Sequence, residues 1–425
     1  MNNQRLELVA DFYEYTMANG YFNKNMQDRI AYFDVFFRKV PDEGGYAIVA
    51  GLEQIINYIR NLSFDEEDIS YLRKQNKFSE EFLNYLENFR FTGDIWAIPE
   101  GTVVFPNEPL ITVKAPIIQA QLLETMLLLT TNHQSLIATK TSRIVKEAQG
   151  RPVMEFGARR AHGISAAVEG ARAAIIGGAV GTSCTLSAKE FNVPASGTMA
   201  HSWIQSFDSE YEAFKAYAEL YPDDCTFLID TYNTIESGLP NAIKVFNEVL
   251  KPKGYRPKAV RLDSGDLAYL SKKVRKILDE AGYEDCKICA TNSLDEYLIK
   301  SLIEQDAKID LFGVGENLIT AKSEPVFGGV YKLVALEKDK KIVPKIKVSE
   351  NTAKVTNPSF KKVYRFYDNE TKKAIADVIT LADEIIDERE YMIFDPQNPW
   401  KKKVLKDYSI RLLQEKIFEE RKINI

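Results

Sequence analysis

Apolar residues between Leu6 and Tyr21 recur at helical spacing, which predicts an amphipathic helix near the start of the chain. Further on, helical patterns alternate with short apolar runs that are separated by Pro, Gly and Asn, which is typical of a mixed α and β region. Residues 1–115 are therefore expected to form an N-terminal α+β domain. Its expected elements after the first helix are a strand at 31–40, helices at 46–62 and 79–89, and short strands within 94–116.

The pattern of apolar residues changes after a long helical pattern at 117–150. Short, nearly continuous apolar runs are each followed by a helical pattern, which predicts parallel βα units that are buried on both faces. About seven such units fit a closed or nearly closed barrel better than an open sheet, so an α/β barrel domain is expected over 116–330. The expected strands are 152–156, 181–187, 198–203, 226–230, 258–263, 287–291 and 309–314, and the intervening helices are 159–176, 208–221, 240–250, 267–281 and 294–305.

The last part of the chain, 331–425, is expected to form a β-rich segment and a helix that partly complete the N-terminal domain. Antiparallel strands are predicted within 328–336, 340–348, 361–368 and 375–381. The pattern at 407–423 is amphipathic and charged, which predicts a solvated surface helix.

Composition narrows the class of protein. The chain has 425 residues, of which 45% are hydrophobic and 27% are charged, as in ordinary globular proteins with a large core. A net charge of -6 provides no general attraction to nucleic acid or to an anionic membrane. The start of the chain has no signal-peptide core, and the longest uncharged stretches, 125–139 and 173–188, are too short and too polar to span a bilayer.

Four cysteines in a chain of this length are expected to be reduced thiols, so the cytoplasm is the expected compartment. Cys286 and Cys289 alone resemble a redox or zinc motif. A second cysteine pair that could complete a zinc site is missing from the sequence, so buried, unreactive thiols are the favoured interpretation.

Polar residues follow six of the apolar runs. In βα barrels the active site lies at the carboxyl ends of the strands, although any one of these residues could simply cap a helix. Six such ends together favour a functional site. They are Glu155 to Arg160, His201 with Ser202, Asp230 with Thr231, Asp263 to Asp266, Thr291 with Asn292, and Gly313 to Glu316.

The glycine-rich turn at Gly313 and Gly315 precedes a helix, where backbone N–H groups favour an anion. Arg159, Arg160 and Arg261 lie at the ends of other strands and would make the pocket locally positive, which suits a phosphorylated substrate.

Carboxylates follow Arg261 closely, at Asp263 and Asp266. Such carboxylates among phosphate-binding cations commonly hold Mg²⁺ or ribose hydroxyls, and the alternative is an Arg–Asp ion pair that caps a helix. His201 is one of only three histidines and has no neighbours at metal-ligand spacing. Its place at a strand end indicates a nucleophilic or acid–base role rather than a structural one.

The chain contains, in this order, the segments ADFYEYTMANGYF, FFRKVPDEGGYAIVAGLE, EFGARRAHG, GGAVGTSC, GTMAHSW, FLIDTYNT, VRLDSGDL and FGVGENLITAKSEPVFGGVYKLV. Taken together, these segments closely resemble nicotinate phosphoribosyltransferases from about Leu8 to Val334. The resemblance implies a type II phosphoribosyltransferase, which is an irregular TIM-like α/β barrel with an α+β domain from both ends of the chain. It also implies a homodimer with shared active sites, and the ATP-coupled reaction of nicotinate with 5-phosphoribosyl 1-diphosphate to give nicotinate mononucleotide and pyrophosphate.

The resemblance also implies roles for single residues. Phe156 would stack on the pyridine ring, and Tyr13 of the partner subunit would cover the other face. Arg159 would lie near the phosphates and the pyridine carboxylate, and His201 would be phosphorylated by ATP. The remaining expected site residues are Arg261, Asp263 and Asp230 as catalytic groups, Gly313 and Gly315 as the 5′-phosphate loop, and Thr182, Ser264 and Gly265 in substrate binding.

Two positions bear on the substrate. The related nicotinamide enzymes have an aspartate where this chain has Ser183, which can donate a hydrogen bond to a carboxylate, so nicotinate is favoured over nicotinamide. Many family members have a hydroxyl residue where this chain has Glu316, which must point away from phosphate or bind a cation. A nicotinamide or quinolinate phosphoribosyltransferase and a catalytically silent nucleotide-binding protein are the alternatives.

Overall fold

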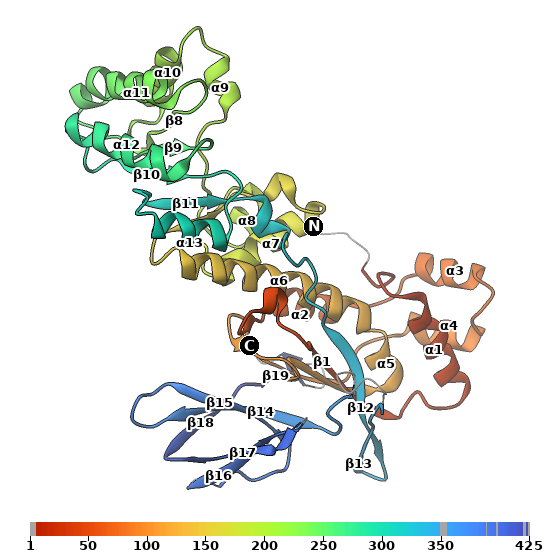
Figure 1. The fold of residues 1–425 in the computed structure, drawn as a ribbon. Coiled ribbons are helices and arrows are strands. Elements are labelled where there is room, and N and C mark those ends of the chain that lie inside the picture. Colours follow the sequence, from red (N-terminus) through yellow and green to blue (C-terminus); the bar gives the residue numbers. More distant parts are fainter. Residues whose placement is uncertain (1–5, 349–354, 388, 397, 420–421, 424–425) are drawn as a thin grey trace. The chain divides into compact units, whose positions relative to one another are not determined.

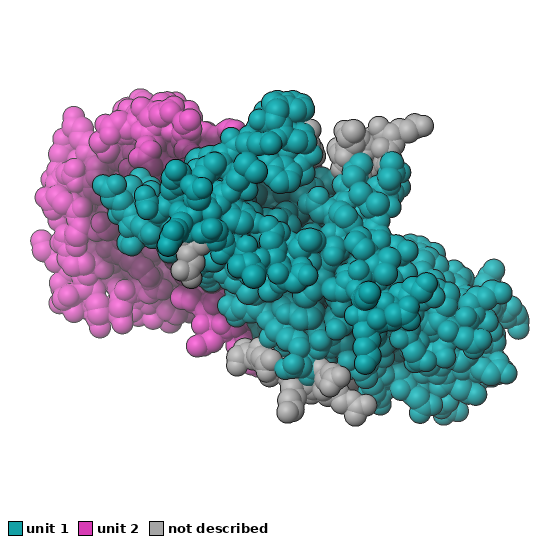
Figure 2. Space-filling view, turned by 90° about the horizontal axis from the view of Figure 1, so that it is seen from below, with its two compact units in different colours: residues 1–135, 326–425 teal, residues 136–325 magenta. Residues whose placement is uncertain are grey.

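The computed structural model describes residues 6–348, 355–387, 389–396, 398–419 and 422–423. The chain divides into two compact units, which Figure 1 shows as a ribbon and Figure 2 in separate colours. Unit 1 combines Met1–Ser135 with Val326–Ile425, and unit 2 is Leu136–Pro325.

Unit 1 is built on an antiparallel sheet of seven strands in the order β13-β12-β1-β5-β3-β19-β20. Strand β1 lies inside this sheet and is buried along nearly its whole length, as its apolar run predicts. Because strands from both ends of the chain share the sheet, the expected α+β domain of N-terminal and C-terminal regions is confirmed. The strands are β1 (Ile30–Phe36), β3 (Asp94–Ala97), β5 (Ile111–Pro116), β12 (Val330–Lys338), β13 (Lys341–Pro344), β19 (Glu415–Glu419) and β20 (Lys422–Ile423).

Helices and smaller sheets complete unit 1. Asp65 and Ser79 cap the helices that follow them, because each side chain accepts backbone N–H bonds of the first turn. The helices are α1 (Phe12–Asn23), α2 (Leu52–Asn61), α3 (Glu66–Lys74), α4 (Glu80–Glu87) and α5 (Ile117–Gln121). The smaller sheets pair β2 (Ala47–Ile48) with β4 (Val103–Val104), β16 (Glu390–Asp395) with β17 (Asn398–Lys406), and β14 (Lys361–Asp368) with both β15 (Ala374–Leu381) and β18 (Tyr408–Leu412).

The helix expected at 407–423 is wrong for the described residues, because β18 and β19 form there instead. Strand β18 pairs with β14, and β19 pairs with β3. Between them, the Gln414 side chain accepts from Val363 N–H and donates to Pro109 carbonyl. These long-range partners override the local helical spacing. Residues 420–421 of the expected helix lie outside the described residues.

Unit 2 contains a parallel six-stranded sheet in the order β7-β6-β11-β10-β9-β8. The strands are β6 (Val153–Glu155), β7 (Gly181–Thr182), β8 (Thr226–Leu228), β9 (Ala259–Leu262), β10 (Lys287–Ala290) and β11 (Leu311–Val314). The helices are α6 (Glu124–Glu147), which begins in unit 1, α7 (Ile164–Ile176), α8 (Thr185–Glu190), α9 (His201–Gln205), α10 (Glu210–Leu220), α11 (Leu239–Val245), α12 (Leu267–Glu280), α13 (Glu296–Glu304) and α14 (Glu316–Ile319). The α/β fold expected for an irregular barrel is confirmed.

The core of unit 2 lies between this sheet and its helices. Helices α10 and α11 lie near β8, and α12 lies near β9 and β10 (Figure 1). Phe227 of β8 stacks on Phe214 of α10 at 4.5 Å and on Phe246 at 5.4 Å between ring centroids, and all three rings are fully buried. Aromatic stacking of this kind joins the helices to the strand.

The strand expected at 198–203 is wrong, because this stretch is a loop that ends in the first turn of α9. The Thr198 hydroxyl and the Met199 carbonyl accept hydrogen bonds from the Arg261 side chain, at 2.8 and 3.1 Å. The loop is therefore held by a side chain of β9 instead of a strand ladder. In the described part of the chain, six parallel strands form where seven were expected.

The division of the chain also differs from the boundaries expected at 115/116 and 330/331. Residues 117–135 belong to unit 1 because their contacts are made there. The Ser135 hydroxyl accepts from Ala50 N–H, and Tyr331 donates to Ala120 carbonyl. Helix α6 thus runs through the boundary, which a helical pattern alone does not reveal.

Candidate active site

A cavity of about 470 Å³ lies at the carboxyl ends of the parallel strands in unit 2. Strand ends are where ligands bind in βα folds, because loops from several strands converge there. Of the residues expected in the site, the structure brings eight together in the lining of this cavity: Phe156, Arg159, Ser183, His201, Arg261, Asp263, Gly313 and Gly315.

Phe156 follows β6 directly, and its ring lies against the neighbouring strand β11. Its backbone N–H donates to Val314 carbonyl at 2.7 Å. A Cβ atom on Gly313 would lie 2.6 Å from Phe156 Cδ2, which is too close for any side chain. Gly313 therefore makes room for the aromatic ring at the cavity wall, which is a second reason for a glycine there besides an expected phosphate.

Arg261 is anchored near the end of β9 with a mostly buried side chain. Besides its bonds to Thr198 and Met199, its Nε donates to the Thr291 hydroxyl at 3.2 Å. Its Nη2 lies 3.6 Å from Asp263 Oδ1, so the two groups are neighbours without a close ion pair. The guanidinium is thus held in place while part of its charge remains available to a ligand.

His201 is the first residue of α9, and its imidazole lies beside residues that follow strands β8 and β9. Its Nδ1 lies 3.1 Å from the Thr231 hydroxyl, and its Nε2 lies 3.6 Å from Asp263 Oδ2. The imidazole is 39% exposed. A histidine that is oriented by a hydroxyl and a carboxylate and is still open to the cavity has the geometry of a reactive group.

Asp230, Ser264 and Gly265 lie outside the lining of the cavity. Asp230 is buried after β8, and its Oδ2 accepts from Asp263 N–H at 2.9 Å and from the Ser264 hydroxyl at 2.5 Å. Gly265 has a φ of 77°, which lets the turn close before α12. In this structure these three residues shape the turn that carries Asp263.

Arg159, Arg160 and Glu316 form the charged rim of the cavity. Glu316 Oε1 accepts from Lys322 Nζ at 2.7 Å, and its Oε2 lies 3.8 Å from Arg160 Nε. The hydrogen bond from Lys322 lowers the pKa of Glu316. The sequence predicts that Glu316 either points away from phosphate or binds a cation. The structure shows the second, because the carboxylate lies beside the side-chain cations of Lys322 and Arg160.

Thr182 and Tyr13 are not in the cavity lining either. Thr182 is fully buried at the end of β7. Tyr13 lies on α1 in unit 1, with 44% of its surface exposed, so unit 2 by itself does not contain it. Burial and the neighbouring Glu124 raise the pKa of the Tyr13 hydroxyl.

Several residues around the site were not assigned roles from the sequence. Thr198 holds Arg261, Thr231 contacts His201, and the Thr291 hydroxyl donates to Asp263 Oδ1. Glu155 is buried behind the cavity and accepts from Thr182. Glu155, Thr231 and Thr291 lie at polar strand ends, which is a usable signal, whereas Thr198 has no such signal.

The structure also bears on the cysteines, on metal binding and on membrane-spanning helices. Cys286 and Cys289 are buried free thiols, as expected, and burial raises the pKa of each to about 12. Across the described residues, no group of three or more His, Cys, Asp or Glu side chains is arranged to hold a metal ion. The described helices include none with the length and apolar character needed to cross a membrane.

Comparison with known proteins covers nearly the whole chain. The family models for the nicotinate phosphoribosyltransferase (NAPRTase) N-terminal domain, the NAPRTase family and the NAPRTase C-terminal domain match residues 8–132, 152–379 and 360–424. Nicotinate phosphoribosyltransferase of Bacillus subtilis is 46% identical over 416 residues, which are 98% of this chain and 84% of that protein. The human enzyme of that name is 30% identical over 436 residues, covering 89% of this chain and 80% of its own.

A solved structure agrees with these sequence matches. The crystal structure of human nicotinic acid phosphoribosyltransferase has a TM-score of 0.85 to this chain at 26% identity, and it covers 97% of this chain and 89% of its own. The fold and the sequence matches therefore agree. The chain belongs to the nicotinate phosphoribosyltransferase family.

Proposed function

We propose that this chain joins nicotinate and 5-phosphoribosyl 1-diphosphate to give nicotinate mononucleotide and pyrophosphate, in NAD biosynthesis or salvage. The observation that carries the proposal is the composition of one cavity. It places an aromatic ring, Phe156, with the cations Arg159 and Arg261 and the acid Asp263. An electron-poor aromatic acid and a phosphorylated sugar are the ligands that such a cavity suits.

The reaction needs positioning and charge stabilisation more than covalent chemistry from the protein. The bond from ribose C1 to the pyrophosphate oxygen breaks, and pyrophosphate leaves with the electron pair. The pyridine nitrogen of nicotinate then donates its lone pair to C1. Asp263 would stabilise the positive charge that develops on the ribose, and Arg261 would hold the ribose and its phosphate.

Mg²⁺ is proposed to enter with the diphosphate. Asp230 Oδ1 is buried and accepts no hydrogen bond from the described residues, and Asp263 is partly exposed beside it, so hard oxygen ligands are present. Mg²⁺ is usually bound by one or two carboxylates together with substrate phosphates, which fits this small donor set. When bound, the ion would neutralise charge on the leaving pyrophosphate.

ATP hydrolysis is proposed to be coupled to synthesis through His201. A ring nitrogen would attack the γ-phosphorus of ATP, ADP would leave, and the phosphoryl group would remain on the imidazole. Exposure of His201 to the cavity and its contacts with Thr231 and Asp263 support this role. The added negative charge would order the surrounding loops around Mg²⁺ and the diphosphate.

Ser183 is proposed to favour nicotinate over nicotinamide, because its hydroxyl is exposed in the cavity and can donate to a carboxylate.

The experiment that tests the proposed function is an assay for nicotinate mononucleotide with and without ATP, with nicotinamide and quinolinate tested in parallel. Product from nicotinate, increased by ATP, is the expected result. Product from nicotinamide or quinolinate alone would contradict the proposal.

A homodimer with shared sites is proposed on the basis of α1. Tyr13 and Met17 are one helical turn apart, and both are exposed, at 44% and 39%. Such an apolar pair on a surface helix suits a partner subunit, whose cavity Tyr13 would complete. Mixing inactive Tyr13→Ala and Arg261→Ala proteins should restore activity, because one site of the heterodimer carries neither change. No recovery in a verified heterodimer would contradict the shared site.

The proposed compartment is the cytoplasm. All four cysteines are free thiols, and three of them are buried, which suits a reducing environment.

A further inference from the structure

We propose that Glu155 is a positioning residue for nicotinate: its buried carboxylate fixes the turn that carries Ser183 relative to the turn that carries Phe156. This inference rests on the proposed function and extends it to a residue that lines no part of the cavity. Glu155 ends β6, and Thr182 ends the adjacent strand β7. The residues that follow them, Phe156 and Ser183, both line the cavity.

The carboxylate of Glu155 accepts a hydrogen bond on each oxygen. Oε1 accepts from the backbone N–H of Gly157, in the turn just after Phe156. Oε2 accepts from the Thr182 hydroxyl at 2.6 Å, and the Thr182 oxygen in turn accepts from Cys184 N–H at 2.9 Å. A continuous chain of hydrogen bonds therefore runs from Gly157 through Glu155 and Thr182 to Cys184. Its two ends lie next to Phe156 and Ser183.

Backbone hydrogen bonds hold β7 on both edges. Its ladder with β6 consists of two residue pairs, Met154 with Gly181 and Glu155 with Thr182, and Ser183 N–H donates to Glu155 carbonyl at 2.9 Å. On the other edge, Thr182 N–H donates to Pro194 carbonyl and Ser196 N–H donates to Thr182 carbonyl. These bonds fix the strand itself. The side-chain bridge from Glu155 adds a constraint that reaches past Ser183 to Cys184, and so helps to fix the turn that carries Ser183.

The bridge needs a carboxylate because both of its partners are donors. A carboxylate offers two acceptor oxygens, whereas an amide offers one acceptor and one donor. In Glu155→Gln the amide oxygen would still accept from Gly157. The amide nitrogen would then face a Thr182 oxygen that already accepts from Cys184 N–H, and the hydroxyl proton would lose its acceptor. Both Glu155 and Thr182 are fully buried, so water cannot replace the lost partner.

The bridge should affect the two substrates unequally. Phe156 and Ser183 are the groups proposed to hold the pyridine ring and its carboxylate. The groups proposed to hold the sugar include Arg261 and Asp263, at the end of β9, which β11 and β10 separate from β6. A shift of Ser183 relative to Phe156 therefore weakens nicotinate binding before it weakens binding of the phosphoribosyl donor.

The test is steady-state kinetics of Glu155→Gln with both substrates varied. We expect the KM for nicotinate to rise about tenfold, with kcat and the KM for the diphosphate within about twofold of wild type. Glu210→Gln is the matched control, because Glu210 is also buried and accepts from a hydroxyl, Ser237, away from the cavity. It should lower the melting temperature without changing the KM for nicotinate. Equal rises in both KM values, or no change in either, would overturn the proposal.

Thr182→Val tests the same bridge from its other end and serves if the Glu155 variant does not fold. It should raise the KM for nicotinate by a similar factor, and Thr182→Ser, which keeps the hydroxyl, should recover most of the loss. The double variant Glu155→Gln/Thr182→Val should show no further rise, whereas additive effects would overturn the bridge. Failure of the proposed function is distinct: wild-type protein would then form no nicotinate mononucleotide at all.

Discussion

Charged side chains are used in opposite ways in the core of unit 1 and in the cavity of unit 2. In unit 1, Lys361 Nζ lies 2.8 Å from Asp34 Oδ2, and the two side chains are only 5% and 2% exposed. In the cavity of unit 2, Asp263 lies 3.6 Å from both Arg261 and His201 and is 29% exposed. Ions paired tightly and away from water hold a fold together, whereas ions paired loosely beside a cavity can exchange partners with a ligand.

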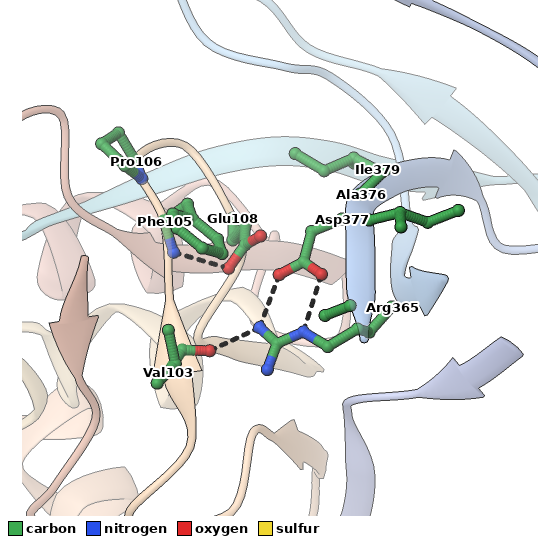
Figure 3. Close-up of a pocket in the computed structure, with 10 residues that line it drawn as sticks. Val103, Phe105, Pro106, Glu108, Arg365, Ala376, Asp377 and Ile379 are labelled. Carbon is green, nitrogen blue, oxygen red and sulfur yellow. Dashed lines mark hydrogen bonds and ion pairs between the residues drawn. The ribbon is translucent and has the colours of Figure 1, made fainter. Parts of the chain in front are cut away.

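A second cluster in unit 1 repeats the first pattern. Arg365 donates from two nitrogens to the Asp377 carboxylate and from Nη2 to Val103 carbonyl at 2.6 Å, and Glu108 lies beside them (Figure 3). These residues line a cavity of about 600 Å³. The Arg365 and Asp377 side chains are 11% and 6% exposed. The contrast between unit 1 and the cavity of unit 2 therefore rests on more than one ion pair.

The largest expected effect comes from breaking the buried pair in unit 1. Lys361→Ala would leave Asp34 with the Thr112 hydroxyl but without its cation. We expect the free energy of unfolding to fall by about 3–5 kcal/mol, measured by urea denaturation. The double variant Asp34→Asn/Lys361→Met removes both charges and should be much closer to wild type. A loss below about 1 kcal/mol in Lys361→Ala would show that the pair does not stabilise the fold.

The corresponding change in the cavity of unit 2 should affect activity more than stability. Arg261→Ala removes a guanidinium proposed to hold the ribose and its phosphate, so kcat/KM should fall by about 10²–10³-fold. Arg256→Ala is the matched control, because Arg256 is an exposed arginine of the same unit, paired with Asp285. Its kcat/KM should match that of wild type. If Arg261→Ala loses as much stability as Lys361→Ala, the contrast between the buried pair and the cavity fails.

Secondary structure is predicted best from sequence in segments whose own residues determine whether they are buried. The runs at 226–230, 258–263 and 287–291 are apolar because they are buried on both faces, and each contains a strand. The polar residues that follow such runs then locate the site. This pattern predicts Arg261, in β9, and Asp263, just after it, at the site, and both line the cavity of unit 2.

Sequence predicts poorly where a distant partner decides the structure. The stretch at 198–203 is a loop because Arg261, 63 residues beyond Thr198, takes its hydrogen-bonding groups. The stretch at 407–419 forms strands because β14 and β3 pair with it. The role of Glu155 is hard to predict for the same reason, since its partner Thr182 belongs to another strand. Each case depends on contacts that local periodicity does not contain.

Glu108, in the buried charged cluster of unit 1, should make the stability of the fold depend on pH. Burial raises the pKa of Glu108 to about 9, and the Asp377 carboxylate adds to the shift, while Arg365 opposes it. The folded chain therefore keeps a proton that the unfolded chain releases above its ordinary pKa of about 4.5. By linkage, this site makes stability fall as pH rises from about 4.5 to about 9.

Glu108→Gln imitates the protonated acid and cannot lose that proton. We expect it to be more stable than wild type by at least about 2 kcal/mol at pH 9 and close to wild type near pH 5, measured by denaturation across this range. Glu370→Gln changes an exposed acid of the same unit and should leave the pH dependence as it is. Parallel pH profiles for wild type and Glu108→Gln would show that Glu108 is ionised in the folded chain.

The smallest expected effect on synthesis comes from His201, because the proposed phosphohistidine assists the reaction without forming the new bond. His201→Asn keeps a polar side chain beside Thr231 but removes the nucleophile. It should lose ATP hydrolysis and the stimulation by ATP, on the order of tenfold, while slow synthesis without ATP continues. Labelled γ-phosphate should remain on wild type and on His162→Asn as an acid-labile, base-stable adduct. Equal labelling of His201→Asn would assign the phosphoryl acceptor to another residue, and His201 would then belong with the groups that only shape the cavity.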